Sequence, residues 1–174
     1  APQARGKALI NLLPLAEGER ITVFAPAGML ALQEVDALAH AAEHQQAGRL
    51  EEAEKMYREI LRNNPENVDT LRLLGTLVMA AGRMHEAEGL FRRAIAYAPD
   101  YAEAHNNLGN ALAQAGQWDE AVTAYEHALR VKSDYAEAHY NLGNLYARQG
   151  RKDEAIAQFE AALRNSPKEV DLFE

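Results

Sequence analysis

The sequence contains no cysteine among its 174 residues, so it can form neither a disulfide nor a thiolate zinc site, and it offers no cysteine nucleophile. Long apolar runs are missing as well, since none approaches the roughly 20 residues that a membrane-spanning helix needs. Aromatic residues make up only 7% of the chain, whereas Ala, Leu, Glu and Arg are abundant. This composition favours an all-α protein with its own core, and we expect it to be soluble and cytoplasmic.

Clusters of basic residues are also absent. The chain has 18 Lys and Arg residues against 26 Asp and Glu residues, which gives a formal net charge of −8. A sequence-independent grip on nucleic acid or on an anionic membrane needs clustered Lys and Arg to displace counterions. We therefore expect no nucleic-acid partner and no membrane partner.

A period of 34 residues runs through most of the chain. Shifting the sequence by this length aligns four glycines, four Glu-Ala pairs and four aromatic residues, namely Gly48, Gly82, Gly116 and Gly150; Glu52-Ala53, Glu86-Ala87, Glu120-Ala121 and Glu154-Ala155; and Tyr57, Phe91, Tyr125 and Phe159. Proline follows in three copies, at Pro65, Pro99 and Pro167, and Ser133 takes its place in the other copy. The chain is therefore built from four copies of one unit.

The third copy shows how one unit is expected to fold. Within residues 102–116, His105, Leu108 and Leu112 recur at helical spacing, and Gly109 on the same helix would let a neighbouring helix approach closely. Gly116 is expected to end this helix in a left-handed conformation, and Asp119 would open the next one at its favourable N-terminus. One such pair cannot bury its apolar stripe alone, so successive pairs must stack.

This pattern resembles the tetratricopeptide repeat family, whose spacing of small, aromatic and proline residues it follows over residues 34–169. The resemblance implies an all-α, right-handed superhelical solenoid of four helix-turn-helix repeats at residues 34–67, 68–101, 102–135 and 136–169. The repeat domain would span residues 29–174, with 170–174 as the truncated start of a further helix. In this family the first helices line a concave face, which is the candidate working surface.

The residues expected to face the groove follow from the same resemblance. In the last three repeats they are Asp69, Arg72, Thr76 and Met79; Glu103, Asn106, Asn107 and Asn110, followed by Ala113; and Glu137, Tyr140, Asn141 and Asn144, followed by Ala147. In the first repeat they are Val35, Leu38, Ala42 and Gln45. The groove is thus expected to be polar, rich in amides and mildly acidic.

The asparagines of this set suggest how a ligand would be held. Side-chain amides both donate and accept hydrogen bonds, so Asn107, Asn110, Asn141 and Asn144 could grip the backbone of an extended peptide. The row is similar to the asparagine ladder of the repeats in O-linked N-acetylglucosamine transferases. An alternative interpretation is that Asn110 and Asn144 are consensus residues of the family with a structural role.

A possible zinc motif lies in the first repeat. The stretch His40 to His44 reads His-x-x-Glu-His, the spacing of a two-histidine zinc site with a glutamate base. In the repeat register, however, both histidines fall where later copies carry Leu, Val or Tyr, so we expect them to point inward. No Ser-His-Asp set and no glycine-rich phosphate loop is visible either. We predict a non-enzymatic protein that needs no metal and no cofactor.

Three functions remain open from the sequence. The first is a scaffold that binds an extended or helical peptide in the concave groove. The second is the substrate-recruiting arm of a larger glycosyltransferase or sulfotransferase. The third is a DNA-binding module, because residues 4–26 resemble a segment of the C-terminal domain of DNA gyrase A. The acidic net charge argues against this third function.

Both ends of the chain lie outside the repeat phase. Residues 1–28 are expected to form a gyrase-like extension, irregular or with a short strand, that packs on the first repeat. At the other end, Ile156, Phe159 and Leu163 are expected to stay partly bare, which predicts weak self-association through the C-terminal repeat.

Overall fold

The computed structural model describes residues 27–166, with side chains from residue 33 onward. This part of the chain forms eight α-helices and no strand. The helices are α1 (Ala27–Gln46), α2 (Leu50–Asn63), α3 (Val68–Ala80), α4 (Met84–Tyr97), α5 (Ala102–Gln114), α6 (Trp118–Val131), α7 (Ala136–Arg148) and α8 (Lys152–Asn165). The all-α prediction is confirmed.

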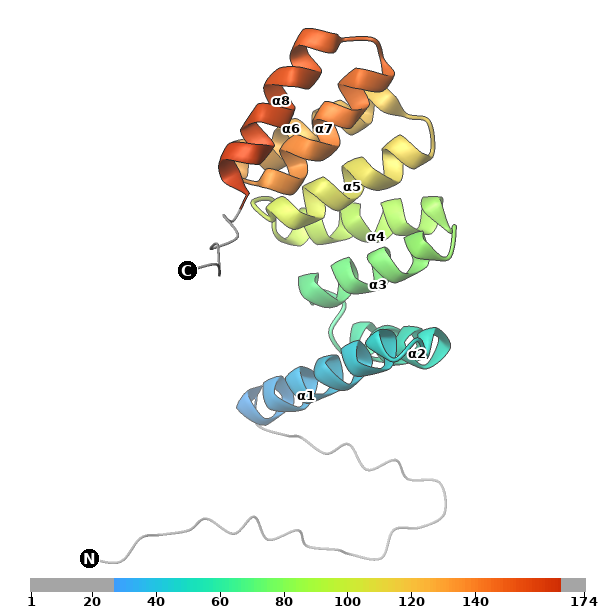
Figure 1. Ribbon diagram of the computed structural model, residues 1–174. Coiled ribbons are helices and arrows are strands. Elements are labelled where there is room, and N and C mark those ends of the chain that lie inside the picture. Colours follow the sequence, from blue (N-terminus) through green and yellow to red (C-terminus); the bar gives the residue numbers. More distant parts are fainter. Residues whose placement is uncertain (1–26, 167–174) are drawn as a thin grey trace, which may run out of the picture.

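The helices pair into four hairpins that stack in chain order, from α1 and α2 at one end to α7 and α8 at the other (Figure 1). The first helices of neighbouring hairpins also contact one another, α3 with α5 and α5 with α7, so they line the inner side of the stack. Helices α3, α5 and α7 begin at the residues where the repeats are predicted to start. Helix α1 begins earlier, at Ala27, and so includes two residues of the expected extension. The rest of that extension, and residues 170–174, lie outside the described residues.

Each hairpin turns at a glycine in the left-handed region. The φ angle is 76° at Gly48 and Gly150, 80° at Gly82 and 81° at Gly116. In the third hairpin the backbone N–H of Gln117 donates to the Leu112 carbonyl at 2.9 Å, which satisfies a carbonyl that the end of α5 leaves free. A residue with a Cβ atom is strained at such a φ, which explains why glycine recurs here.

Inside each later hairpin, a second glycine allows the two helices to meet. A Cβ atom added to Gly109 would lie 2.6 Å from Cε1 of Tyr125, and one added to Gly75 would lie 2.5 Å from Cε1 of Phe91. Gly143 meets Phe159 in the same way, at 2.8 Å. The aromatic ring of the second helix thus packs directly on the backbone of the first helix.

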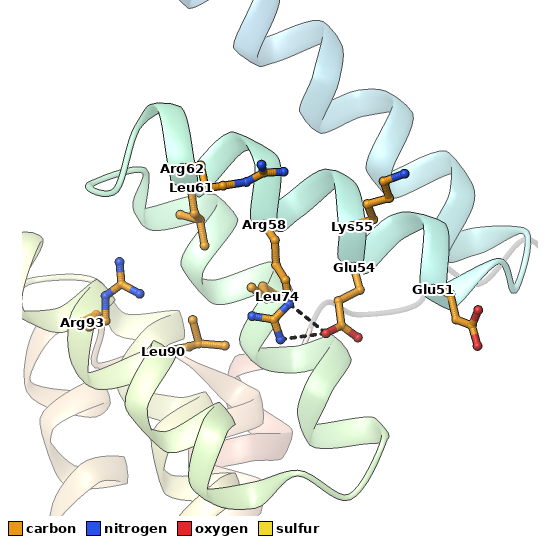
Figure 2. Close-up of a pocket in the computed structure, with 9 residues that line it drawn as sticks. All are labelled: Glu51, Glu54, Lys55, Arg58, Leu61, Arg62, Leu74, Leu90 and Arg93. Carbon is orange, nitrogen blue, oxygen red and sulfur yellow. Dashed lines mark hydrogen bonds and ion pairs between the residues drawn. The ribbon is translucent and has the colours of Figure 1, made fainter.

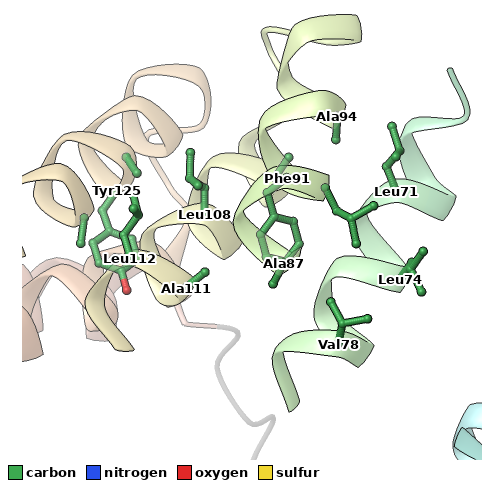
Figure 3. Packing of buried hydrophobic residues seen from close by; sticks show 14 of the residues in the cluster. Leu71, Leu74, Val78, Ala87, Phe91, Ala94, Leu108, Ala111, Leu112 and Tyr125 are labelled. Carbon is green, nitrogen blue, oxygen red and sulfur yellow. The ribbon is translucent and has the colours of Figure 1, made fainter. Parts of the chain in front are cut away.

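Between hairpins, apolar side chains form one continuous core (Figure 3). Phe91 and Ala94 of α4 are fully buried among Leu71 and Leu74 of the preceding helix and Leu108 of the following one. Burying a phenylalanine or leucine side chain contributes roughly 1.5–3 kcal/mol to stability. Because α2, α4 and α6 each pack on the first helix of the next hairpin as well as on their own partner, the hairpins share their cores.

Ion pairs on the outer side join successive hairpins. Arg58 of α2 lies 2.5 Å from Glu86 of α4, and the equivalent Arg92 lies 3.3 Å from Glu120 of α6. The third junction differs because the equivalent residue is Glu126, which accepts a hydrogen bond from the Tyr146 hydroxyl at 3.4 Å. These pairs are partly exposed, so each contributes only about 0–1 kcal/mol.

The prediction that His40 and His44 point inward is wrong for His40. Its ring is exposed and its Nδ1 lies 2.9 Å from the Asp36 carbonyl of the same helix, whereas the half-buried His44 accepts a hydrogen bond from Arg49. In later repeats the equivalent leucines, such as Leu108, lie beside the second helix of the preceding hairpin. Helix α1 has no such neighbour within the described residues, so His40 meets solvent.

We predict that replacing Gly109 by Ala destabilises the protein although Ala is the better helix former. The added methyl group would overlap the Tyr125 ring, and relieving such an overlap costs about 1–3 kcal/mol. Gly89 of α4 is the matched control, because a Cβ atom there meets nothing within 4 Å. Gly89→Ala should stabilise the protein by about 0.5–1 kcal/mol. Urea unfolding measures both variants, and equal changes would contradict the proposed packing.

Candidate functional site

The predicted groove residues come together on three helices. Helix α3 carries Asp69, Arg72, Thr76 and Met79; α5 carries Glu103, Asn106, Asn107 and Asn110; and α7 carries Glu137, Tyr140, Asn141 and Asn144. Hydrogen bonds between residues of different repeats show that these side chains share one surface. In the first repeat, Gln45 instead accepts a hydrogen bond from the buried Tyr57 hydroxyl at 2.8 Å.

At one end of this surface a tyrosine hydroxyl bridges a guanidinium and a carboxylate. The Nε atom of Arg72 donates to the Tyr101 hydroxyl at 2.6 Å, and that hydroxyl donates to Oδ1 of Asp69, also at 2.6 Å. The arginine guanidinium lies 6.0 Å from the centre of the Tyr101 ring, within reach of a cation–π contact. Because Tyr101 lies directly before α5, this cluster holds Arg72 in place where α3 and α5 meet.

Asn106 does not line the groove as predicted. Its side chain is 0% exposed, and it donates to Oε1 of Glu137 at 2.9 Å and accepts from Nδ2 of Asn141 at 3.1 Å. A buried amide needs such partners, since leaving it unpaired would cost about 1–3 kcal/mol. Asn106 therefore positions two groove residues of the next repeat rather than contacting a ligand itself.

The other asparagines keep part of their hydrogen-bonding capacity. The amide of Asn107 donates to Thr76 at a long 3.5 Å, and Asn110 uses its oxygen to accept from the Tyr125 hydroxyl at 2.7 Å, which leaves its amide N–H groups free of partners within the described chain. Asn144 is half-buried and its side chain bonds to no other described residue. The residue of the fourth repeat that corresponds to Tyr125 is Phe159, whose ring has no hydroxyl to donate to Asn144. The amides of Asn107, Asn110 and Asn144 thus keep groups that a ligand could bind.

The remaining predicted residues frame the surface. Glu103 lies 4.0 Å from the Lys132 ammonium, and Met79 packs half-buried against the core. Tyr140 is 55% exposed, and its ring centre lies 5.9 Å from that of Phe159. Together with Asn144 and Leu163 these rings line a hollow of about 580 Å³.

Two tyrosines that were not predicted from the sequence also belong to the site. Tyr101 and Tyr135 each precede a first helix, at the place that Asn67 occupies before α3. Burial raises the pKa of Tyr101 to about 12, helped by its hydrogen bond to Asp69. Burial also raises the pKa of Tyr135 to about 12, with Glu137 and Glu103 adding to the shift. Their recurrence one period apart was the signal in the sequence.

The groove carries side chains of a few chemical kinds. Within residues 33–166, no three His, Asp or Glu side chains gather as they would around a metal ion. Over the described stretch, no helix combines the length and the apolarity needed to cross a membrane. The groove offers amides, hydroxyls, three carboxylates and one half-buried guanidinium, which is a set suited to holding a polar chain. The class of protein that the fold and the groove define is a protein-interaction scaffold.

Comparison with known proteins agrees with this class. Three models described as tetratricopeptide repeat match residues 33–77, 66–134 and 106–170. These matches overlap and together run from the middle of α1 to beyond α8. The chain belongs to the tetratricopeptide repeat family. Comparison with curated proteins finds no match.

Solved structures show the same solenoid. An O-GlcNAc transferase mutant of Thermobaculum terrenum is 36% identical, with a TM-score of 0.65 over 67% of this chain, although the match covers only 22% of the transferase chain. YrrB, a TPR protein with an unusual peptide-binding site, is 24% identical with a TM-score of 0.66, covering 78% of this chain and 70% of its own. MamA of Desulfovibrio magneticus RS-1 is 17% identical, with a TM-score of 0.69 and coverage of 76% and 75%. The last two matches concern the fold alone.

We predict that the groove tyrosines make stability sensitive to alkaline pH. Their pKa is about 12 in the folded protein and about 10 when unfolded, so the folded state retains protons that the unfolded state loses. The stabilisation is therefore complete below about pH 10 and is lost as the pH rises towards 12.

Replacing Asp69 by Asn tests the cause of the Tyr101 shift. The carboxylate raises this pKa, so the variant should lower it, whereas Tyr135, which is not shifted by Asp69, serves as the internal control. Carbon NMR of labelled tyrosine rings as a function of pH measures both. An unchanged Tyr101 midpoint in the variant would refute the hydrogen bond.

Proposed function

We propose that the chain is a non-enzymatic scaffold that holds an extended peptide segment in its concave groove. The observation that carries this proposal is the row of amides with spare hydrogen-bonding capacity, Asn107, Asn110 and Asn144, spread over α5 and α7. A peptide backbone presents one donor and one acceptor per residue, which a primary amide can meet together. Recognition of this kind depends on the backbone more than on side chains.

The surroundings of the amides support an ordered groove rather than a flexible one. Arg72 is fixed by Tyr101, and Asn141 is fixed by the buried Asn106. Groups that are already held in place lose less conformational entropy when a ligand binds. The groove is also continuous from α3 to α7, because each inner helix contacts the next.

The test starts with peptides selected on the wild-type protein from a random library. The affinity of the selected peptides is then measured by calorimetry for Asn107→Ala/Asn144→Ala and for a control variant on the outer helices, Arg130→Ala/Lys152→Ala. Two lost hydrogen bonds of about 0.7 kcal/mol each should weaken binding about tenfold. The control should bind like the wild type, since both of its residues are exposed on α6 and α8.

Two results would count against the groove. One is equal affinity of the selected peptides for both double variants. The other is a selection that yields no peptide with saturable binding. Helical content of the variants, followed by circular dichroism, separates a lost contact from a lost fold.

A second candidate function is the substrate-recruiting arm of a larger glycosyltransferase or sulfotransferase. The 36% identity to the repeats of an O-GlcNAc transferase favours it. The coding sequence on either side of this chain tests the idea. An in-frame catalytic domain would support the arm, and its absence from both sides would leave the independent scaffold. The gyrase-like segment falls outside the described residues, so the idea of a DNA-binding module gains nothing from the structure.

A further inference from the structure

A cleft opens on the outer side of the stack, between the second helices of the first two hairpins (Figure 2). Its volume is about 730 Å³. Leu61 of α2, Leu74 of α3 and Leu90 of α4 provide its apolar part, at the junction where the two hairpins meet. The cleft is separate from the groove, because it is built mainly by the second helices and contains none of the predicted groove residues.

The cleft is basic in an acidic protein. Of its nine lining residues four are basic and two are acidic, whereas the whole chain has a formal net charge of −8. Arg58 is neutralised by Glu54 and Glu86, at 2.7 and 2.5 Å. Lys55, Arg62 and Arg93 form no ion pair with any described residue, and Arg93 donates only to the Pro65 carbonyl, at 3.3 Å. Three cations are thus left beside an apolar floor.

The equivalent outer cleft one repeat further on lacks this positive charge. It lies between α4 and α6, has a volume of about 530 Å³, and keeps the aliphatic floor and the arginine of the ion pair, with Leu108 and Arg92 in place of Leu74 and Arg58. The three unneutralised cations of the first cleft have no cationic counterpart there. Lys55, Arg62 and Arg93 correspond to Gly89, Ala96 and His127. Packing of the repeats therefore does not require these basic residues. Of the two junctions, only the first has them.

We propose that this cleft binds an acidic peptide segment that carries an apolar side chain. Carboxylates of the segment pair with Lys55, Arg62 and Arg93 at the rim, and a leucine-sized side chain enters between Leu61 and Leu90. The positive charge of the cleft indicates an acidic partner. The protein as a whole has a formal net charge of −8 and would repel an acidic chain elsewhere on its surface. A nucleic acid is the poorer occupant, because its long run of phosphates meets the acidic remainder of the surface and it has no aliphatic group for the floor.

The test uses three labelled hexapeptides and fluorescence anisotropy at low salt. The first has the sequence Glu-Leu-Glu-Glu-Leu-Glu with both ends blocked, the second has Gln for every Glu, and the third has Ser for every Leu. We expect saturable binding of the first peptide and binding at least about tenfold weaker for the other two. Raising the salt should weaken the first complex, because exposed ion pairs are screened.

Matched variants locate the site. Lys55→Gln/Arg62→Gln removes two rim charges that make no ion pair in the described chain, and should weaken binding of the first peptide about tenfold, at about 0.7 kcal/mol per exposed contact. Arg130→Gln/Lys152→Gln removes the same charge elsewhere on the outer helices and should leave binding unchanged. Asn107→Ala/Asn144→Ala should also leave it unchanged, because the groove is not involved.

Several outcomes would overturn the inference. Equal binding by the two charge variants shows that the cleft is not the site. Weaker binding by the asparagine variant places the acidic peptide in the groove, which supports the groove and removes the cleft. Equal affinity for the serine peptide, or for a short DNA duplex, shows a general attraction for anions in place of the proposed pocket. Absence of saturable binding by the first peptide rejects the proposal and leaves the groove untouched.

Discussion

The close contact between a glycine backbone and an aromatic ring inside each of the last three hairpins is the constraint on which the other features depend. A single methyl group on the glycine would overlap the ring. The three contacts join Gly75 to Phe91, Gly109 to Tyr125 and Gly143 to Phe159. This contact fixes how far apart the two helices of a hairpin are. It therefore also fixes where the second helix presents its other face to the next hairpin, and so how the inner helices follow one another along the groove.

The surface of the proposed groove is a consequence of that stacking. The hydrogen bond from Arg72 to Tyr101, directly before α5, and the one from Asn141 to Asn106 can form only because adjacent inner helices are in contact. The same stacking leaves clefts between the outer helices, and their chemistry changes from one junction to the next while their aliphatic floor persists. One scaffold thus offers two surfaces of different character, an amide-rich inner groove and a basic outer cleft.

Much of the fold could be predicted from the sequence, because the features that determine it recur at a fixed period. The turn glycines, the glycine beside the ring and the start of each later repeat all follow from local backbone geometry and helix periodicity. The placement of individual polar side chains could not be predicted in this way. His40 is exposed because its helix lacks a preceding hairpin in the described chain, and Asn106 is buried because Glu137 and Asn141 of the next repeat close over it. Tyr101 and Tyr135 were missed because they lie just before the first helices, outside the helical periodicity.

The most direct measurement is a map of where a bound peptide lies. A library-selected peptide with a nitroxide spin label at one end broadens the amide NMR signals of nearby residues. We predict that broadening is strongest along α3, α5 and α7, including Asn107 and Asn144, and is weak on the outer faces of α4 and α6. Broadening confined to the outer helices, with the inner helices unaffected, would contradict the claim that the stacked hairpins form a peptide-binding groove.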